Sequence, residues 1–410
     1  MMDRVPAAPG LSCSIRSQYD VIVVGAGVAG AFAALLAARR GLQVLLVDRQ
    51  RFPRSKVCGC CLNRRAQQIL QRAGLDAGLR ALNPAPADAV QLRHGHRSLQ
   101  ISVPGGLAIS RGVLDQWLVD EAVLAGAQFL DDLTATVLPL SSRPAFSGPA
   151  GLSDPTLRTV ELRNNSLKTL TTASVVLVCD GLGHPSLQRL AGFESVPRNG
   201  ARLGLGAMFP RGAADDWIPR HQILMSLARQ GYAGIVQVEN GQLVLAAAVD
   251  ATALQKSQSP LACLSKILEA AGCPVPEALP SASIRGTIPL TRTSSRLCDH
   301  RLMVLGDAAG YVEPFTGEGM AWALSAAALA APIVAMAVSG GWSTATEKQF
   351  LTEFEAAIIR EQRLCGLLSK VLRHSALLSL TFAGFRLFPR LGGQLANRIS
   401  RLPASLDQTQ

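Results

Sequence analysis

The chain of 410 residues predicts an α/β fold with a helical C-terminus. Two glycine-containing turns, each directly after a short apolar run, are typical of a parallel sheet whose strands alternate with helices. Alternating apolar and polar residues predict a second, antiparallel sheet, with strands at residues 204–209, 223–227, 235–239 and 243–249. Because these strands lie between the two turns in the sequence, the second sheet is inserted into the first domain.

The first turn, residues 25–30, reads Gly-Ala-Gly-Val-Ala-Gly and follows an apolar run at residues 20–24. An alanine-rich helical stretch comes next, and a second apolar run at residues 43–47 ends on Asp48. This order of strand, turn, helix and acidic strand end is typical of a Rossmann-like unit that binds the ADP part of a dinucleotide.

Each residue type in this unit has a physical reason. Gly25 allows the turn, Gly27 lets the backbone approach a pyrophosphate, and Gly30 lets helix and strand pack closely. The helix N-terminus faces the phosphates, and Asp48 accepts hydrogen bonds from the ribose hydroxyls. Two further residues of the unit are expected at the cofactor: Ala29 and Arg49.

The second turn distinguishes FAD from NAD, which also carries ADP. An apolar run at residues 302–305 ends at Gly306 and Asp307, and Gly317 and Gly319 follow before a long apolar helix. A flavin needs a carboxylate for its ribitol hydroxyls and a helix N-terminus near its N1–C2 edge, where negative charge collects on reduction. The sequence therefore predicts a composite Rossmann-like FAD-binding domain.

Three more segments carry a resemblance to a known family. They are Ile-Ser-Arg at residues 109–111, a strand that ends in Asp180-Gly181, and Lys-Val-Cys-Gly at residues 56–59. With the two turns, they resemble the FAD-dependent oxidoreductases of the para-hydroxybenzoate hydroxylase type, and the geranylgeranyl reductase-like branch in particular. The resemblance spans roughly residues 19–340 and implies that Arg111 lies beside the flavin and that Asp180 belongs to the cofactor site.

The same resemblance implies an enzyme that transfers a hydride through flavin N5 at a carbon–carbon double bond of an apolar organic or isoprenoid-like substrate. Cys58 and Tyr232 are the candidate proton donors. The run at residues 231–236, Gly-Tyr-Ala-Gly-Ile-Val, lacks the Trp and Phe-Pro of the prenyl-lipid reductase motif. Two alternatives stay open: a flavin monooxygenase that hydroxylates, epoxidises or halogenates through a flavin peroxide, and a membrane-associated flavin-binding subunit without catalysis.

The electron donor is left open by the sequence. A second glycine fingerprint is missing from the chain, so NAD(P)H is expected to dock transiently over the flavin, or a ferredoxin or flavodoxin supplies the electrons.

Nine cysteines in a chain of this length lack the density of a disulfide framework, which favours a reducing cytosol. Three of them are clustered as Cys58, Cys60 and Cys61. A zinc site needs a second group of ligands, which the sequence lacks, so no metal is expected. The remaining interpretations are a thiol beside the flavin and small side chains that fill space near the cofactor.

The domain organisation follows from these markers. A flexible leader is expected at 1–18, the composite FAD-binding domain at 19–82, 107–200 and 285–345, the substrate domain at 83–106 and 201–284, and a basic helical region at 346–410. Residues 320–338 carry no charge and are long enough to span a bilayer. Since they directly follow the second glycine turn, we expect a helix buried against the sheet.

Positive charge is concentrated near the C-terminus. Residues 360–401 hold eight Lys or Arg and one Glu, interleaved with leucine and phenylalanine at helical spacing. Such a helix fits a membrane surface or carrier partner, or equally a solvated face on its own domain; nucleic acid is not expected. The expected location is cytoplasmic, with the inner face of the membrane as a peripheral contact. Truncation near Ala356 is expected to keep FAD binding, because all flavin motifs lie upstream.

Overall fold

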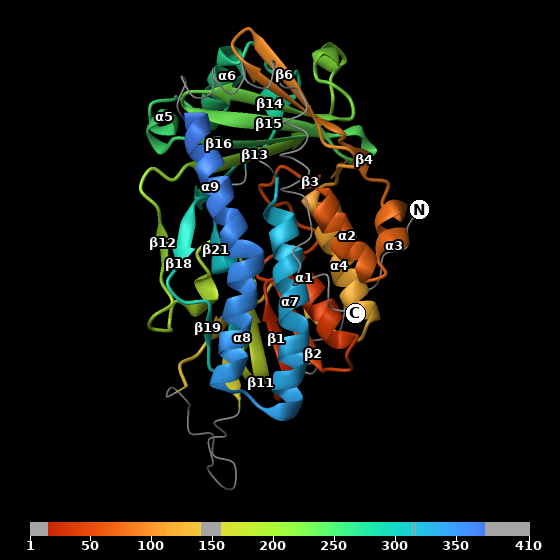
Figure 1. Ribbon diagram of the computed structural model, residues 1–410, viewed down its shortest axis with the longest axis vertical. Coiled ribbons are helices and arrows are strands. Elements are labelled where there is room, and N and C mark those ends of the chain that lie inside the picture. Colours follow the sequence, from red (N-terminus) through yellow and green to blue (C-terminus); the bar gives the residue numbers. More distant parts are fainter. Residues whose placement is uncertain (1–14, 141–156, 314, 316, 374–410) are drawn as a thin grey trace.

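The computed structural model describes residues 15–140, 157–313, 315 and 317–373, with side chains as far as residue 367. Figure 1 shows a helix-flanked sheet in the lower part of the molecule and a second sheet above it. Both arise from one chain that crosses between them several times, as the inserted arrangement requires.

The first sheet has the parallel order β20-β11-β1-β2-β8, with β19 antiparallel at one edge. Its strands are β1 (Gln18–Val24), β2 (Val44–Val47), β8 (Gln128–Leu130), β11 (Lys168–Val178), β19 (Cys298–Asp299) and β20 (Leu302–Val304). A hairpin of β9 (Thr134–Val137) and β10 (Arg158–Arg163) pairs with the first half of β11. The central strands are buried on both faces, which explains their continuous apolar sequence.

Helices cover this sheet through small side chains. α1 (Val28–Ala38) packs against both α4 (Arg111–Leu124) and α7 (Gly319–Gly340), and α7 also contacts α2 (Arg64–Arg72). Alanine dominates α1 and α7, so their backbones approach closely. α3 (Asp76–Ala81) follows α2. As expected, α7 is a core helix: it is long and apolar enough to cross a membrane, but 72% of its most apolar window is buried.

Two element ends differ from the sequence prediction. β1 begins at Gln18, and Ser17 accepts a hydrogen bond from Thr172 N, so the end of the expected leader belongs to the sheet. The sequence of residues 111–128 predicts one continuous helix, but α4 ends at Leu124, because Gln128 starts β8 and pairs with β2. Residues 1–14 of the leader lie outside the described residues.

The second sheet has the order β17-β13-β16-β15-β14-β5-β6 and is antiparallel except between β14 and β5. Its strands are β5 (Ala89–His94), β6 (Arg97–Ser102), β13 (Leu203–Phe209), β14 (Gln222–Ala228), β15 (Gly231–Gln237), β16 (Leu243–Val249) and β17 (Arg285–Pro289). α6 (Pro260–Ala270), which follows the short α5 (Ala251–Gln255), packs on one face, as seen at the top of Figure 1. The other face looks toward the first domain, where Val236 and Val244 cluster with Cys60.

Two strands of the second sheet correct the prediction. β15 begins at Gly231 rather than residue 235, and Glu239 lies beyond its end in a short helical turn. Glycines at 231 and 234 interrupt the apolar alternation that sequence patterns rely on. β17 pairs with β13, so the chain returns to the first domain after Pro289 and not at residue 285.

Smaller elements join the two parts. One three-stranded sheet is β3 (Cys61–Leu62), β7 (Leu107–Ala108) and β4 (Ala85–Pro86); the other is β12 (Ser195–Pro197), β18 (Arg292–Ser294) and β21 (Gly310–Tyr311). The C-terminal helices α8 (Thr344–Phe354) and α9 (Arg360–Arg373) are linked by a π-helical turn and run beside α7 (Figure 1). The phenylalanines of the predicted basic face lie outside the described residues.

Candidate flavin-binding site

A cleft of about 740 Å³, including space open to solvent, lies at the carboxyl ends of the parallel strands. It brings together eight residues that the sequence predicts: Gly27, Ala29, Cys58, Arg111, Gly306, Asp307, Gly317 and Gly319. Its lining also contains residues to which the sequence assigns no role: Lys56, Val57, Cys179, Gly181, Tyr311, Met320 and Ala323. The two glycine turns, nearly 300 residues apart, therefore share one cavity.

The three fingerprint glycines do different work. Gly25 has φ +98°, and a Cβ there would lie 2.4 Å from the carbonyl oxygen of Cys179. A Cβ on Gly30 would lie 1.8 Å from the oxygen of Gly25, so helix and strand could not pack. At Gly27 the nearest atoms are only the tips of two arginines, at 3.3 and 3.4 Å. Gly25 and Gly30 are required by the fold, whereas Gly27 leaves space for a ligand.

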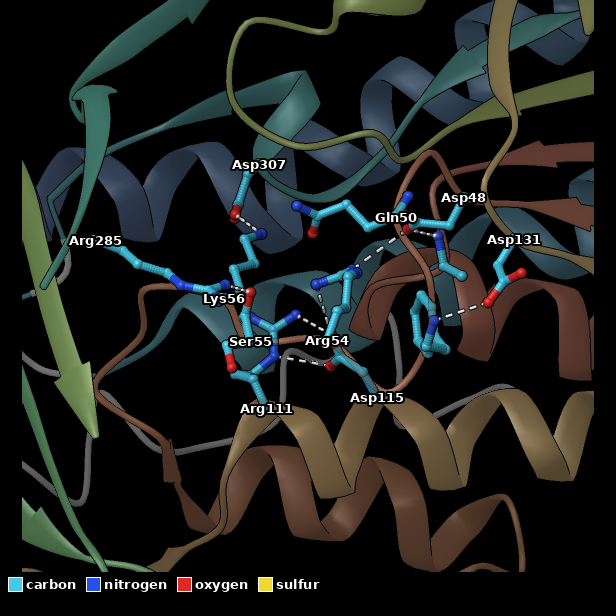
Figure 2. Close-up of polar contacts among 12 residues, drawn as sticks. Asp48, Gln50, Arg54, Ser55, Lys56, Arg111, Asp115, Asp131, Arg285 and Asp307 are labelled. Carbon is cyan, nitrogen blue, oxygen red and sulfur yellow. Dashed lines mark hydrogen bonds and ion pairs between the residues drawn. The ribbon is translucent and has the colours of Figure 1, made fainter. Parts of the chain in front are cut away.

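Those two arginines are Arg54 and Arg111, which lie next to each other beside Asp115 in Figure 2. Arg111 donates two hydrogen bonds of 2.8 Å to the fully buried Asp115. Arg54 lies between Asp115, at 3.3 Å, and Asp48, at 3.5 Å. Among the described residues its buried Nε finds no hydrogen-bond partner. Two guanidinium groups over a Cβ-free backbone fit the pyrophosphate of FAD.

The side chain of Arg111 both forms an ion pair with Asp115 and lines the cleft. Burial alone would lower the pKa of Arg111, but the charges of Asp115 and Cys58 outweigh it and raise the pKa. Arg111 therefore remains a cation in the cleft. The start of α1 adds partial positive charge, since it has no side-chain cap and no acidic residue in its first turn.

Asp48 stands at the end of β2 and is fastened to the glycine turn. Its Oδ2 accepts a hydrogen bond from Ala26 N at 2.9 Å, and its Oδ1 accepts one from Gln50 N at 2.9 Å (Figure 2). This fixes a buried carboxylate at the position where an adenosine ribose is expected. Arg49, the next residue, is exposed and does not line the cleft.

Asp307 lines the same cleft as Gly27 and lies in the turn after β20. Its Oδ2 pairs with the ammonium of Lys56 at 2.8 Å (Figure 2). Gly306, at φ +61°, brings this turn against α1, because a Cβ there would lie 2.9 Å from Cβ of Ala29. The predicted ribitol carboxylate is thus held in place by a lysine from the other motif.

The N-terminus of α7 closes the flavin end of the cleft. Gly317 has φ +76° and packs against Cys61, and Glu318 occupies the N-cap position without a side-chain cap hydrogen bond. The first N–H groups of α7 are therefore available to the N1–C2 edge of a flavin. Glu318 itself is buried, and burial raises the pKa of its carboxyl to about 8.

Asp180 follows β11 and does not line the cleft, although its neighbours Cys179 and Gly181 do. Its Oδ2 accepts a hydrogen bond from Ser186 N at 2.8 Å. Burial raises the pKa of its carboxyl to about 6. Asp180 therefore holds the turn at residues 185–187 and is not itself a lining residue of the cleft.

The three clustered cysteines all line the cleft. The hydrogen bond with the Cys60 side chain lowers the pKa of the Cys58 thiol, against the effect of burial, and the charge of Arg111 contributes. The same contact and burial raise the pKa of Cys60, and burial raises the pKa of Cys61 to about 12. Negative charge is therefore concentrated on Cys58.

Tyr232, the other candidate proton donor, lies behind the cleft in β15. Its ring packs edge-on against Phe315, with centroids 5.3 Å apart, and Arg202 lies over it at 5.8 Å. Tyr311 shares the same apolar cluster but lines the cleft itself. Burial raises the pKa of Tyr311, so its hydroxyl stays protonated. The structure places Tyr311, rather than Tyr232, at the cavity.

Comparisons with known proteins agree with this geometry. Residues 18–136 match the model of the FAD binding domain. The chain is 28% identical over 369 residues to menaquinone reductase of Mycolicibacterium smegmatis, covering 84% of both chains. It is 26% identical to digeranylgeranylglycerophospholipid reductase 2 of Methanothermobacter thermautotrophicus, covering 82% of both. p-Nitrophenol 4-monooxygenase from Pseudomonas putida has the same fold, with TM-score 0.72, 15% identity, and coverage of 94% of this chain and 97% of that one.

The chain is an FAD-dependent oxidoreductase. Residues 18–136 carry the FAD-binding domain, and the two relatives named above are reductases, as the motifs predict. The mixed α/β fold and the cofactor FAD are confirmed with it.

Three parts of the oxidoreductase's site escaped sequence analysis. Arg54 and Lys56 belong to a loop whose side chains look solvated in the sequence, and Tyr311 stands outside any motif. The signal that could have identified the loop is its composition: Arg54 lies two residues before Lys56, which begins the Lys-x-Cys-Gly motif, and the predicted site also contains the carboxylates of Asp48 and Asp307. Their partners are distant in sequence and meet only through the fold.

The C-terminal helices also belong to the site. Arg65, which is fully buried, pairs with Glu361 of α9 and donates to the oxygen of Ala357 at 3.1 Å. Trp322 of α7 donates to Glu361 at 3.2 Å. Phe354 and Ile358 line a small cavity together with Asp307 and Gly319. The full lining is Gly306, Asp307, Gly310, Tyr311, Gly319, Trp322, Ala326, Phe354, Ile358 and Gln362. Truncation near residue 356 would remove this support, so the expectation of intact FAD binding is corrected.

Proposed function

We propose that this oxidoreductase saturates a carbon–carbon double bond in an isoprenoid-like chain. The observation that carries the proposal is the position of Cys58, a thiol of lowered pKa, in the same cleft as Gly27, Asp307 and Gly317. FAD, when bound there, supplies the hydride from N5. A reduction also needs a proton, and the cleft offers side chains that hold one.

The chain's own residues have separable tasks in this proposal. Arg54 and Arg111 bind the pyrophosphate, Asp48 binds the ribose, and Asp307 orients the ribitol with the help of Lys56. The start of α7 stabilises negative charge on the N1–C2 edge. The side chains of Arg54, Arg111, Asp48 and Asp307 are held by internal hydrogen bonds or ion pairs, which lowers the cost of ordering them around FAD.

The proton is held close to the substrate side by thiols and a phenol. Cys60, with a raised pKa, keeps its proton, whereas its contact with Cys58 lowers the pKa of the Cys58 thiol, so Cys60 is the proton reservoir of the pair. Tyr311 holds a second proton on its hydroxyl. The proton first passes from Cys60 to the Cys58 thiolate, and Cys58 then transfers it to the substrate carbon. We place Cys58 as the donor because it belongs to the Lys-x-Cys-Gly loop.

An apolar substrate fits the remainder of the cleft. Val57, Met320 and Ala323 line it, and Val57 packs into the second sheet against Gly206. Menaquinone and digeranylgeranylglycerophospholipids both carry isoprenoid chains, and enzymes named for reducing them align with four fifths or more of this chain. Both lines of support concern the class of substrate, an isoprenoid-like chain, and not one compound.

We further propose NAD(P)H or a small electron carrier as the donor, and a cytoplasmic enzyme that reaches lipid substrates by peripheral contact with the inner membrane face. The support for membrane contact is the basic and apolar composition of residues 360–401 and the poor water solubility expected of the substrates.

The decisive experiment is a turnover assay on the FAD-loaded protein without oxygen. Dithionite-reduced enzyme is mixed with a prenylated quinone or a digeranylgeranyl phospholipid, and the product is analysed by mass spectrometry. We expect products that have gained two hydrogens per saturated double bond, and loss of the reaction in Asp307→Ala.

A parallel assay in air measures oxygen uptake with the same substrates. Oxygen uptake that depends on substrate and gives an oxygenated or halogenated product would replace the reductase with a monooxygenase. Cys58→Ser should slow saturation while leaving the FAD content unchanged; full activity in this variant would remove Cys58 from the proposed mechanism.

A further inference from the structure

Cys58 and Cys60 contact each other through both sulfurs and both backbones. Cys60 N donates to Sγ of Cys58 at 3.3 Å, and Sγ of Cys60 donates to the carbonyl oxygen of Cys58 at 3.6 Å. Only one residue, Gly59, separates them. Each sulfur therefore lies against the backbone of the other cysteine, across a loop of one residue.

The backbone of Cys60 is unusual for a residue with a side chain. Its φ is +56°, in the left-handed region that favours glycine. It is also buried, at 3% exposed. A strained, buried residue beside a ligand cleft is commonly retained because its side chain has a task. Here the conformation turns the Cys60 sulfur back toward Cys58.

Cys61 is arranged differently. It begins β3, and its Sγ donates to the carbonyl oxygen of Gly59 at 3.0 Å. Its Cβ packs against Gly317. Adjacent cysteines are also poorly placed for a disulfide of ordinary geometry. Cys61 thus provides a matched control in the same loop.

The two contacting thiols divide the chemistry of thiol exchange between them. Cys58 is partly exposed to the cleft and lies within the field of Arg111, which favours its thiolate form. Cys60 is buried behind it and keeps its proton. An accessible nucleophile with a buried second thiol is the arrangement that attacking and resolving cysteines require.

We propose that Cys58 and Cys60 form a redox-active dithiol that closes to an intramolecular disulfide when a small organic disulfide enters the cleft. The Cys58 thiolate attacks one sulfur of the disulfide, forms a mixed disulfide and releases one thiolate, which takes up a proton. Cys60 then loses its proton and attacks Sγ of Cys58, which forms the Cys58–Cys60 bond and releases the second thiol. The dithiol is oxidised by two electrons, and one organic disulfide is reduced to two thiols.

Closure would remove the thiol of Cys58 from the substrate cavity, so the oxidation state of the pair would control the reduction reaction. This inference rests on the loop geometry and does not depend on the identity of the substrate. It therefore stands or falls separately from the proposed function.

The test uses the full-length, FAD-loaded protein and 2-hydroxyethyl disulfide as the probe. The protein is treated with the organic disulfide in the absence of oxygen. Free thiols are then alkylated and the protein is digested with trypsin. Cleavage after Lys56 and Arg64 releases a peptide that contains all three cysteines. Fragmentation of this peptide identifies which sulfurs are joined, and flavin absorbance confirms that each variant is folded.

We expect the wild type and Cys61→Ser to give a peptide with a Cys58–Cys60 disulfide that dithiothreitol reverses. Cys60→Ser should stop at a mixed disulfide on Cys58, because the resolving thiol is missing. Cys58→Ser should not react under the same conditions. The proposal is overturned if the wild type accumulates only the mixed disulfide, or if the internal bond persists in Cys60→Ser or is absent from Cys61→Ser.

Discussion

The ammonium of Lys56 lies 2.8 Å from Oδ2 of Asp307, although 251 residues separate them in the sequence. Lys56 begins the Lys-x-Cys-Gly segment and Asp307 belongs to the second glycine turn, and both side chains line the cleft. Both side chains are partly buried, at 32% and 20% exposed, so solvent screens the pair only in part. The contact fixes the orientation of a carboxylate that must meet the ribitol of FAD.

This pair gives a graded prediction for FAD affinity. Lys56→Met should weaken binding by about 1.4- to 5-fold, since a partly exposed ion pair contributes about 0.2–1 kcal/mol. Asp307→Ala should weaken it by roughly 10- to 150-fold, because a hydrogen bond to a charged group contributes about 1.5–3 kcal/mol. Titration of apoprotein with FAD by fluorescence quenching measures both, with Lys56→Arg as the conservative control. Equal effects of the two substitutions would contradict the assigned roles.

The glycine turn predicts a separation between folding and binding. Gly27→Val should yield a folded protein without FAD, because a Cβ there meets only the ends of two arginine side chains, at 3.3 and 3.4 Å, but the valine fills the pyrophosphate position. Gly30→Ala should fail to fold, because its Cβ would overlap the oxygen of Gly25. Circular dichroism and flavin absorbance distinguish the two outcomes. Tight FAD binding by Gly27→Val would show that the cofactor does not approach this turn.

Glu318 predicts a pH dependence of stability. Burial raises the pKa of its carboxyl from 4.5 to about 8 in the folded protein, so the folded state holds the proton more tightly than the unfolded state does. Its contribution is fully present below about pH 4.5 and is lost as the pH rises through about 8. The free energy of unfolding should fall by up to roughly 1.4 kcal/mol per pH unit across that window.

Glu318→Gln should flatten this fall, since an amide does not titrate, whereas Glu269→Gln, on the exposed end of α6, should leave it unchanged. Urea unfolding at pH 5, 6, 7 and 8 measures the difference. A parallel decline in the wild type and in Glu318→Gln would assign the pH dependence to other groups.

Two truncations separate the support of the site from membrane contact. Ending the chain after residue 356 removes both partners of buried Arg65 and should destabilise the protein by about 3–5 kcal/mol, the cost of leaving a buried charge unpaired. Ending it after residue 373 keeps those partners, so FAD content and melting temperature should stay near the wild-type values. Thermal unfolding followed by flavin release compares the two.

The same pair of truncations tests the basic segment. If residues 374–401 contact anionic lipid, the protein that ends after residue 373 should lose binding to vesicles of phosphatidylglycerol. Binding of the wild type should weaken as salt rises, because exposed charges are screened over about 8 Å at physiological ionic strength. Unchanged vesicle binding by the protein that ends after residue 373 would exclude residues 374–401 as the membrane contact.

The sequence by itself determined the cofactor and most of its ligands. Gly25, Gly27 and Gly30 were predictable because strand, turn and helix are adjacent in the chain, and the position of Asp48 at a strand end follows from the same local pattern. The antiparallel strands were also visible, since alternation over five or more residues is a local property. β15 escaped in part because its glycines hide that alternation.

The tertiary structure decided which distant groups meet. Arg54, Lys56 and Arg65 look like solvated surface residues in the sequence, yet each is placed against a carboxylate from another part of the chain: Asp115, Asp307 and Glu361. It also placed Tyr311 rather than Tyr232 at the cleft and turned Cys60 toward Cys58. Local patterns report backbone conformation and burial, whereas ion pairs and shared cavities depend on the packing of elements that are remote in sequence.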